Sequence, residues 1–349
     1  MTTTLVEAAE SRPSGPLGRS AQRGVGLVLV LGLAVWLVWN FVSAPRQFAD
    51  VALAGLSVGA LYGLIALGYT LVYGIIGLIN FAHGDLFMLG SVFSSILLVD
   101  WLGANTAGPR SWVLMVLVLG VVMAACAGIN AASELLAYRR LRRAPKLAAL
   151  ITSVGLSFVF RWLGLQLNGP GQRVWPTIIP SGGIRLGPVT IGYSTLVVTG
   201  VTVPLLLALT YIVQYTRQGK AMRAASQDPE TALLMGVNVD RVIAFTFALG
   251  GALGGAAGLL YLETLGDTNY SVGAQFGLIA FTGAVLGGVG NLLGAVIGGY
   301  VIGLVQAFND GLPYGLGQQW SQSVVFLVLI LLLVFRPEGL LGTRTVESV

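Results

Sequence analysis

The feature that most constrains this chain is a series of long apolar stretches separated by charged or turn-forming residues. A helix crosses a bilayer with about 20 mostly apolar residues, and all its backbone polar groups must be satisfied within the hydrocarbon. We therefore expect an all-α fold, a polytopic membrane helix bundle with about 8 to 10 transmembrane passes and possible re-entrant segments. The expected spans are residues 25–42, 51–73, 86–102, 112–132, 147–167, 193–215, 242–262, 274–288, 292–308 and 321–335.

Composition supports the same class, since 55% of the residues are hydrophobic and only 9% are charged. A soluble domain carries roughly 25% charged residues. The uncharged run from Val272 to Phe308 is too long for one crossing. We expect it to break at the glycines of the sequence Gly287-Gly288-Val289-Gly290-Asn291, which would give two short passes or re-entrant halves.

The basic residues predict the orientation of the bundle. Of the 19 Lys and Arg residues, 14 fall on one side of the expected spans, 4 on the other and Arg161 inside a span. Because cytoplasmic loops carry an excess of Lys and Arg, we expect the amino terminus and the richer side to be cytoplasmic. The high isoelectric point is explained in this way without a nucleic acid partner.

The first apolar stretch raises the question of a cleavable signal peptide, because it ends in the small residues Val42-Ser43-Ala44. Pro45 directly after that site would obstruct the peptidase. We expect a cytoplasmic disordered tail over residues 1–24, followed by a retained anchor helix over residues 25–44.

The sequence offers no constellation for catalysis or metal binding. His83 and Cys126 are its single histidine and cysteine. A phosphate-binding loop would need a lysine followed by Ser or Thr, whereas the two lysines here are followed by Leu147 and Ala221. We expect no catalytic, cofactor or metal site, and any ATP hydrolysis would belong to another chain.

One loop, residues 217–241, carries the signals of a short rigid helix. Asp228 is a predicted N-cap, Pro229 stands at the first helical position, Glu230 lies in the first turn and Gly236 ends the helix. The side chains of Leu233, Leu234 and Val237 would form an apolar face. This helix would either dock into a groove on a partner or lie against the bilayer.

A second break contains the polar residues Asn80, His83 and Asp85 in an otherwise apolar region. A carboxylate at the centre of a bilayer costs roughly 2.5 to 3.5 kcal/mol. A capped turn on the cytoplasmic side would avoid this cost, whereas a gate or pathway element near the translocation axis would use the charge. Arg161 is expected to reach the outer surface from its helix end.

The loop over residues 217–241 resembles the coupling loop of bacterial ABC-importer permeases, whose signature runs Glu-Ala-Ala, three residues, then Gly. Glu230, Thr231, Ala232 and Gly236 match this spacing with one Ala replaced by Thr, and the later Ile-x-Leu-Pro part is absent. The resemblance implies a helix that couples the pore to an ATPase. Its residues would be Arg223, Gln227, Asp228, Pro229, Glu230, Ala232, Leu233 and Gly236.

Four ordered blocks resemble branched-chain amino acid permease subunits. They read GLSVGALYGLIALGYTLVYGIIGLINFAHGDLFMLG, RAASQDPETALLMGVNVDRVIAFTFALGGALGGAAG, VLGGVGNLLGAVIGG and FRPEGLLG. The resemblance covers residues 48–343, an expected importer permease domain that leaves residues 344–349 as a tail.

This resemblance implies a multi-pass protein of the bacterial cytoplasmic (inner) membrane that takes up branched-chain or related neutral amino acids. Its partners would be cytoplasmic ABC ATPase subunits, a second permease subunit, a periplasmic or lipid-anchored solute-binding protein and membrane lipid, with no nucleic acid. The residues leave open a urea or short-amide permease, an ion-coupled secondary carrier with broken helices, and a passive channel.

Overall fold

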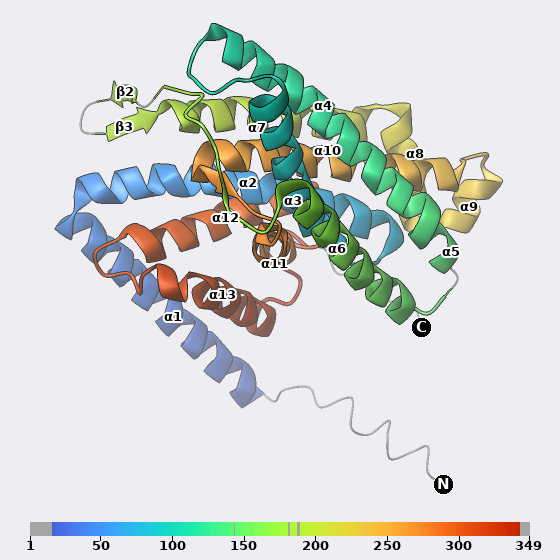
Figure 1. Ribbon diagram of the computed structural model, residues 1–349. Coiled ribbons are helices and arrows are strands. Elements are labelled where there is room, and N and C mark those ends of the chain that lie inside the picture. The colour runs from blue at the N-terminus through green and yellow to red at the C-terminus, as the bar shows by residue number, and fades with distance from the viewer. Residues whose placement is uncertain (1–15, 143, 181, 187–188, 343–349) are drawn as a thin grey trace.

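The computed structural model describes residues 16–142, 144–180, 182–186 and 189–342. Within these ranges, nine helices are long and apolar enough to cross a membrane, and the shorter apolar helix Val272–Gly287 is a tenth apolar segment. The fold is the predicted all-α, multi-pass membrane bundle (Figure 1).

The elements follow one another in an almost wholly helical order. They are α1 (Pro16–Ser43), α2 (Pro45–Ile76), α3 (Ala82–Ser95), the π-helix η2 (Ile96–Trp101), α4 (Pro109–Ser133), the π-helix η3 (Glu134–Tyr138), α5 (Arg139–Leu141), α6 (Lys146–Asn168), β1 (Arg173–Val174), β2 (Gly183–Leu186), β3 (Val189–Gly192), α7 (Tyr193–Tyr215), α8 (Arg217–Gln227), α9 (Pro229–Leu234), α10 (Val239–Leu265), β4 (Asp267–Thr268), α11 (Val272–Gly287), α12 (Leu292–Gly311), the 3-10 helix η4 (Gln318–Trp320) and α13 (Ser321–Phe335). The four short strands form two antiparallel pairs, β1 with β4 and β2 with β3.

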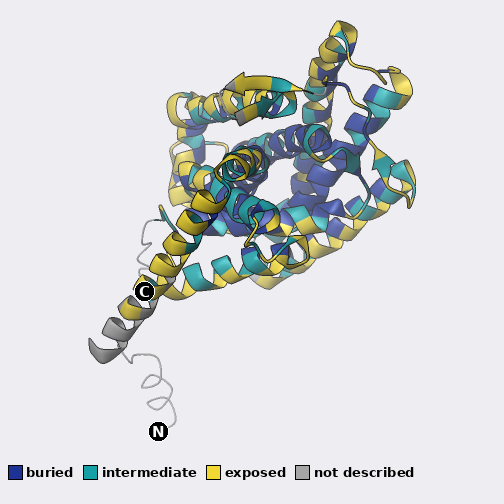
Figure 2. Ribbon diagram, turned by 90° about the vertical axis from the view of Figure 1, so that its left-hand side faces the viewer, coloured by how far each residue is buried: buried dark blue, intermediate teal, exposed yellow. Residues whose placement is uncertain are grey.

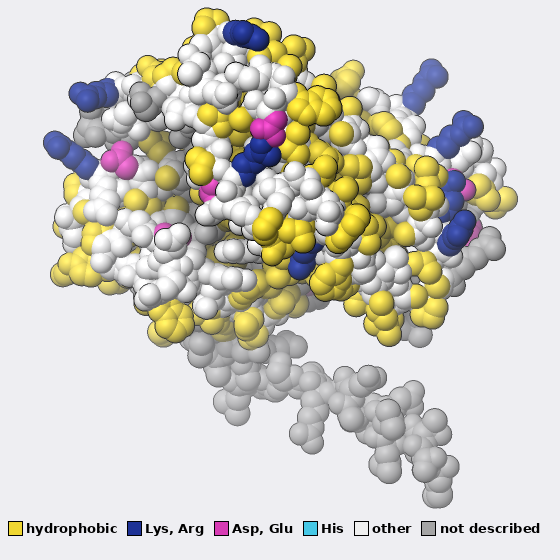
Figure 3. Space-filling view, in the orientation of Figure 1, with side chains coloured by type: hydrophobic (Ala, Val, Ile, Leu, Met, Phe, Trp, Pro, Cys, Tyr) yellow, Lys and Arg dark blue, Asp and Glu magenta, His cyan; other side chains and the backbone are white. Residues whose placement is uncertain are grey.

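The bundle has two distinct ends. Helices α5, α8 and α9 lie together at one end, and the β2–β3 hairpin lies at the other (Figure 1). Dark blue Lys and Arg side chains gather at the end with α5, α8 and α9 (Figure 3). We call this the inner end, because it is the end that the positive-inside rule assigns to the cytoplasm; the opposite one is the outer end.

The centre of the bundle is made of α2, α3, α10, α11 and α12, which pack against one another and hold most of the buried residues, dark blue in Figure 2. Helices α1, α4, α6, α7 and α13 surround them and expose large apolar side chains. In a bilayer such an apolar exterior faces lipid or another apolar protein surface, so the exposed leucines and valines carry no penalty.

Glycines let the central helices approach one another closely. A methyl group at Gly59 of α2 would lie 2.7 Å from the Cα atom of Tyr300 in α12, and one at Gly299 would meet the backbone of Gly63. Lipid supplies no hydrophobic drive for helix association, so tight backbone packing between small residues stabilises the pair instead. We call this contact the α2–α12 seam.

The predicted break in the long uncharged run is confirmed. Helix α11 ends at Gly287 and α12 begins at Leu292. Gly288 and Gly290 have φ angles of 101° and 92°, which favour glycine, and the side chain of Asn291 accepts a hydrogen bond from the backbone N–H of Gly294 at 3.0 Å. Two short helices therefore replace one continuous span.

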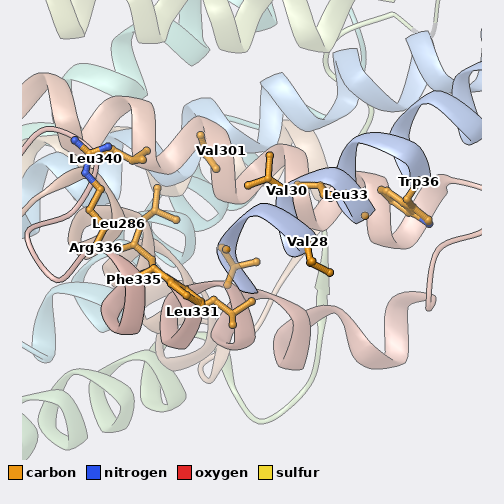
Figure 4. Close-up of a pocket in the computed structure, with 14 residues that line it drawn as sticks. Val28, Val30, Leu33, Trp36, Leu286, Val301, Leu331, Phe335, Arg336 and Leu340 are labelled. Carbon is orange, nitrogen blue, oxygen red and sulfur yellow. The ribbon is translucent and has the colours of Figure 1, made fainter. Parts of the chain in front are cut away.

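The first helix begins at Pro16, upstream of the expected residue 25, so part of the predicted tail is helical. Residues 1–15 and 344–349 of the two predicted tails lie outside the described residues. Between α1 and α13 runs an apolar groove of about 1090 Å³ whose walls include Leu33, Val301 and Phe335, with Arg336 also lining it (Figure 4). Besides lining this groove and packing against α2, α1 makes few contacts with the bundle. It is therefore a peripheral helix.

Candidate functional site

The short helix α9 at the inner end has the predicted start and stop. Asp228 accepts hydrogen bonds from the backbone N–H groups of Glu230 at 3.0 Å and Thr231 at 3.2 Å, and Pro229 is the first helical residue. Gly236 follows with a φ angle of 83°. The Thr231 hydroxyl also donates to Asp228, and these bonds lower the pKa of the Asp228 carboxyl because they stabilise its charged form.

Helix α8, which precedes α9, was not predicted from the sequence. The Thr216 hydroxyl caps it by accepting from the Gly219 N–H at 3.1 Å, and Arg223 donates to the carbonyl of Val213 at the end of α7. Arg223 therefore anchors α8 to a spanning helix, while Gln227 is the last residue of α8 and is exposed. The cap at Thr216 was the sequence signal that could have found this helix.

The exposed apolar surface of α9 differs from the predicted face. The side chains of Leu233, Leu234 and Met235 are 62%, 86% and 81% exposed, and we call these three residues the α9 tip. Val237 was assigned to this face wrongly, because it packs against the hydrophobic core after the chain turns at Gly236. Ala232 is buried and faces the bundle.

An ion-pair network fixes the base of this region. Glu134 in η3 is fully buried and accepts hydrogen bonds from Arg139 at 3.1 Å and from Arg142. Arg142 also donates to Asp240, at 2.5 Å, in the first turn of α10. The network joins the end of α4 to the helix that follows α9, so it links the inner loops to the spanning bundle.

The three polar residues of the second break do not converge on one site. The Asn80 side-chain oxygen accepts from the Tyr138 hydroxyl at 2.8 Å and from the Ala82 N–H at 3.1 Å. His83 is buried against Gly68 and Gly254, with its ring edge-on to that of Tyr69 at a centroid distance of 4.8 Å.

Asp85 is buried in the first turn of α3, not in a turn at the inner surface. One carboxylate oxygen accepts from the Arg161 Nε at 3.0 Å, and the other accepts from the Ser157 hydroxyl. Arg161 also donates from its Nη2 to the Ser157 Oγ at 3.1 Å. The expectation that Arg161 reaches the outer surface is therefore wrong, because a buried carboxylate holds it inside.

The position of this ion pair along the helices places it well within the bundle. Arg161 stands 15 residues after Lys146, the first residue of α6, which is about 22 Å along a helix. Gly273, beside Asp85, lies a similar distance of about 21 Å from Gly287 at the inner end of α11. Asp85 stands 15 residues before Asp100 at the outer end, which is also about 22 Å along a helix, so the pair lies about midway between the two ends of the bundle.

The loop between α6 and α7 is held in place at the outer end by polar contacts. Arg173 pairs with Asp100, Gln172 donates to Asp267, and the Trp175 indole N–H donates to Glu263 at 3.1 Å. These contacts tie the segment between α6 and α7 to the ends of η2 and α10.

Helices with apolar exteriors, a glycine-packed centre holding a buried ion pair, and a short capped helix at the basic end define the class of multi-pass membrane permeases. Residues 51–334 match the family described as branched-chain amino acid transport system / permease component, and the chain belongs to this family.

Curated relatives resemble the chain over most of its length. It is 36% identical over 301 residues to the high-affinity branched-chain amino acid transport system permease protein BraD of Pseudomonas aeruginosa, covering 84% of this chain and 96% of that protein. It is 37% identical over 303 residues to the corresponding protein LivH of Escherichia coli K12, with the same coverage of 84% and 96%.

A more distant relative is the probable branched-chain amino acid transport permease protein LivH of Methanocaldococcus jannaschii. It is 27% identical over 315 residues, which cover 80% of this chain and 88% of that protein. No solved structure matches the chain.

Proposed function

We propose that this chain is the transmembrane permease subunit of an ATP-binding-cassette importer in a bacterial cytoplasmic membrane. Its substrates are branched-chain or closely related neutral amino acids, delivered by a solute-binding protein. The observation that carries this proposal is the identity of 36 to 37% to permeases of branched-chain amino acid systems across nearly their whole length.

The α9 tip supports a docking role for the inner end. Three exposed apolar side chains on a capped helix next to basic loops fit a groove on a soluble partner, since helices dock through such faces. We assign this groove to the ATPase subunits, with a second permease chain completing the pore. Energy then comes from ATP hydrolysed in a partner, and this chain has a transport role without its own enzymatic step.

The competing carrier hypothesis makes a different prediction about energy. An ion-coupled carrier would stop when ion gradients collapse, whereas an ATP-driven importer would continue. Family membership favours the importer over both the ion-coupled carrier and a urea or short-amide permease.

The function is tested with the complete importer reconstituted in proteoliposomes. We expect leucine uptake that requires the binding protein and ATP, survives ionophores, and is abolished when the partner ATPase is inactivated. Uptake that persists with an inactive ATPase would overturn the proposal.

The docking role is tested at α9 in the same preparation. We expect L234D, E230K and G236V to insert normally but to lower ATPase co-purification and uptake on the order of tenfold, the loss typical of an interface anchor. The matched control is S226D, which adds a charge to an exposed position of α8 outside the α9 tip. If the three variants assemble and transport as S226D does, α9 is not the ATPase contact.

A further inference from the structure

A cavity of about 160 Å³ lies directly beside the buried ion pair. Arg161 and Ser157 of α6 form one wall, and Gly273, Ala274 and Gly277 of α11 form another. Tyr69 and the apolar side chains of Phe81, Val154 and Leu278 complete the lining.

The two principal walls present hydrogen-bond donors. Arg161 uses its Nε and one Nη2 proton on Asp85 and Ser157, and its Nη1 has no partner among the described residues. Opposite it, the first turn of α11 has backbone N–H groups without partners within the helix. The Ser271 hydroxyl does not cap them, because it donates to the Asn269 side chain at 2.7 Å.

The carboxylate of Asp85 lies between the two walls, because its Oδ1 is against Gly273 in the first turn of α11. Both of its oxygens are engaged by Arg161 and Ser157, and it is absent from the lining. It acts as a positioning residue that fixes the guanidinium. The fixed guanidinium keeps its Nη1 for a ligand, and a guanidinium binds the two oxygens of a carboxylate in parallel beside a helix N-terminus that also favours negative charge.

The surroundings of the cavity argue for a pathway position. Arg161 is 33% exposed at mid-membrane depth, and facing lipid there would cost roughly 2.5 to 3.5 kcal/mol. Charged residues at such depth face protein or a water-filled route and mark substrate pathways.

We infer that Arg161 and the first turn of α11 bind the α-carboxylate of an amino acid at the middle of the membrane, with Asp85 and Ser157 holding Arg161 in place. The apolar part of the lining then receives the start of the aliphatic side chain. This inference rests on the proposed function and adds a named binding site to it.

The site is tested by direct binding to the complete importer in nanodiscs without the solute-binding protein, using tritiated leucine as the probe. We expect saturable binding to the wild type that leucinamide, in which a neutral amide replaces the carboxylate, does not displace. R161Q is expected to weaken binding on the order of tenfold or more, R161K to retain part of it, and the exposed control R110Q to leave it unchanged.

D85N separates positioning from binding. It is expected to weaken leucine binding while the preference for leucine over leucinamide remains, whereas R161Q loses that preference. Equal displacement by leucinamide in the wild type would overturn the site even if R161Q failed to assemble. Wild-type leucine binding that R161Q leaves unchanged would also overturn it. Absence of ATP-driven leucine uptake in proteoliposomes would instead contradict the proposed function.

Discussion

Single charged residues inside the bundle depend on their partners. Asp85 and Arg161 are held together in the membrane, where removing one member would leave the other charge uncompensated. The sequence indicated that Asp85 would be costly at the centre of a bilayer and that Arg161 lay inside a span, but it could not pair them. They are far apart along the chain, and no local pattern reveals which spans pack side by side.

The Asp228 cap gives a prediction at this scale. We expect D228N to preserve α9, because Asn is an equally good N-cap, and D228A to raise amide exchange at Glu230 and Thr231 on the order of fivefold. Hydrogen exchange measured on the reconstituted importer checks both variants. Equal exchange in D228A and D228N would show that the side-chain cap is dispensable.

The lowered pKa of Asp228 also sets a pH dependence. A depressed pKa in the folded state contributes stability above the unfolded value of about 3.9, and this is lost as pH falls through the lower folded value. Between about pH 5 and 8 the cap therefore stays charged. We expect exchange at Glu230, corrected for its intrinsic rate, to be flat across that interval, and a rise within it would contradict the assignment.

At the scale of elements, the sequence predicted the starts, ends and breaks of helices that are set by short-range contacts. The cap at Asp228, the stop at Gly236 and the break at Gly287 depend on neighbouring residues, so the sequence predicts them. The packing of Val237 against the core was missed, and the depth of Asp85 was left open between a turn and a pathway element, because both depend on tertiary packing.

The α2–α12 seam gives a prediction for a pair of elements. We expect G59L to separate the helices and to destabilise the chain by about 1 to 3 kcal/mol, because an added side chain has no space against Tyr300. The matched control is G120L in α4, since an added Cβ there meets nothing within 4 Å and the residue is exposed. Thermal unfolding in detergent compares them, and equal stability of the two variants would show that the seam is not tightly packed.

For the whole molecule, the sequence predicted the class and most span positions, because bilayer thickness and charge asymmetry act on the chain as a whole. The two ends separate basic inner loops from the β2–β3 hairpin (Figures 1 and 3). The span positions therefore followed from composition, the choice of central and peripheral helices required the structure, and the orientation stays a prediction.

Orientation is checked by cysteine labelling, which is simple because Cys126 is the single cysteine and is buried. In a C126A background, we expect L234C to react with a membrane-impermeant maleimide only in inside-out vesicles and R185C only in right-side-out ones. Labelling of L234C from the periplasmic face would reverse the orientation and remove the ATPase contact.

The seam between α2 and α12 also bears on how this permease opens. Where backbone meets backbone there are few side-chain torsions to rearrange, so the two helices travel as one block. Force applied at the inner loops would therefore tilt that block as a unit.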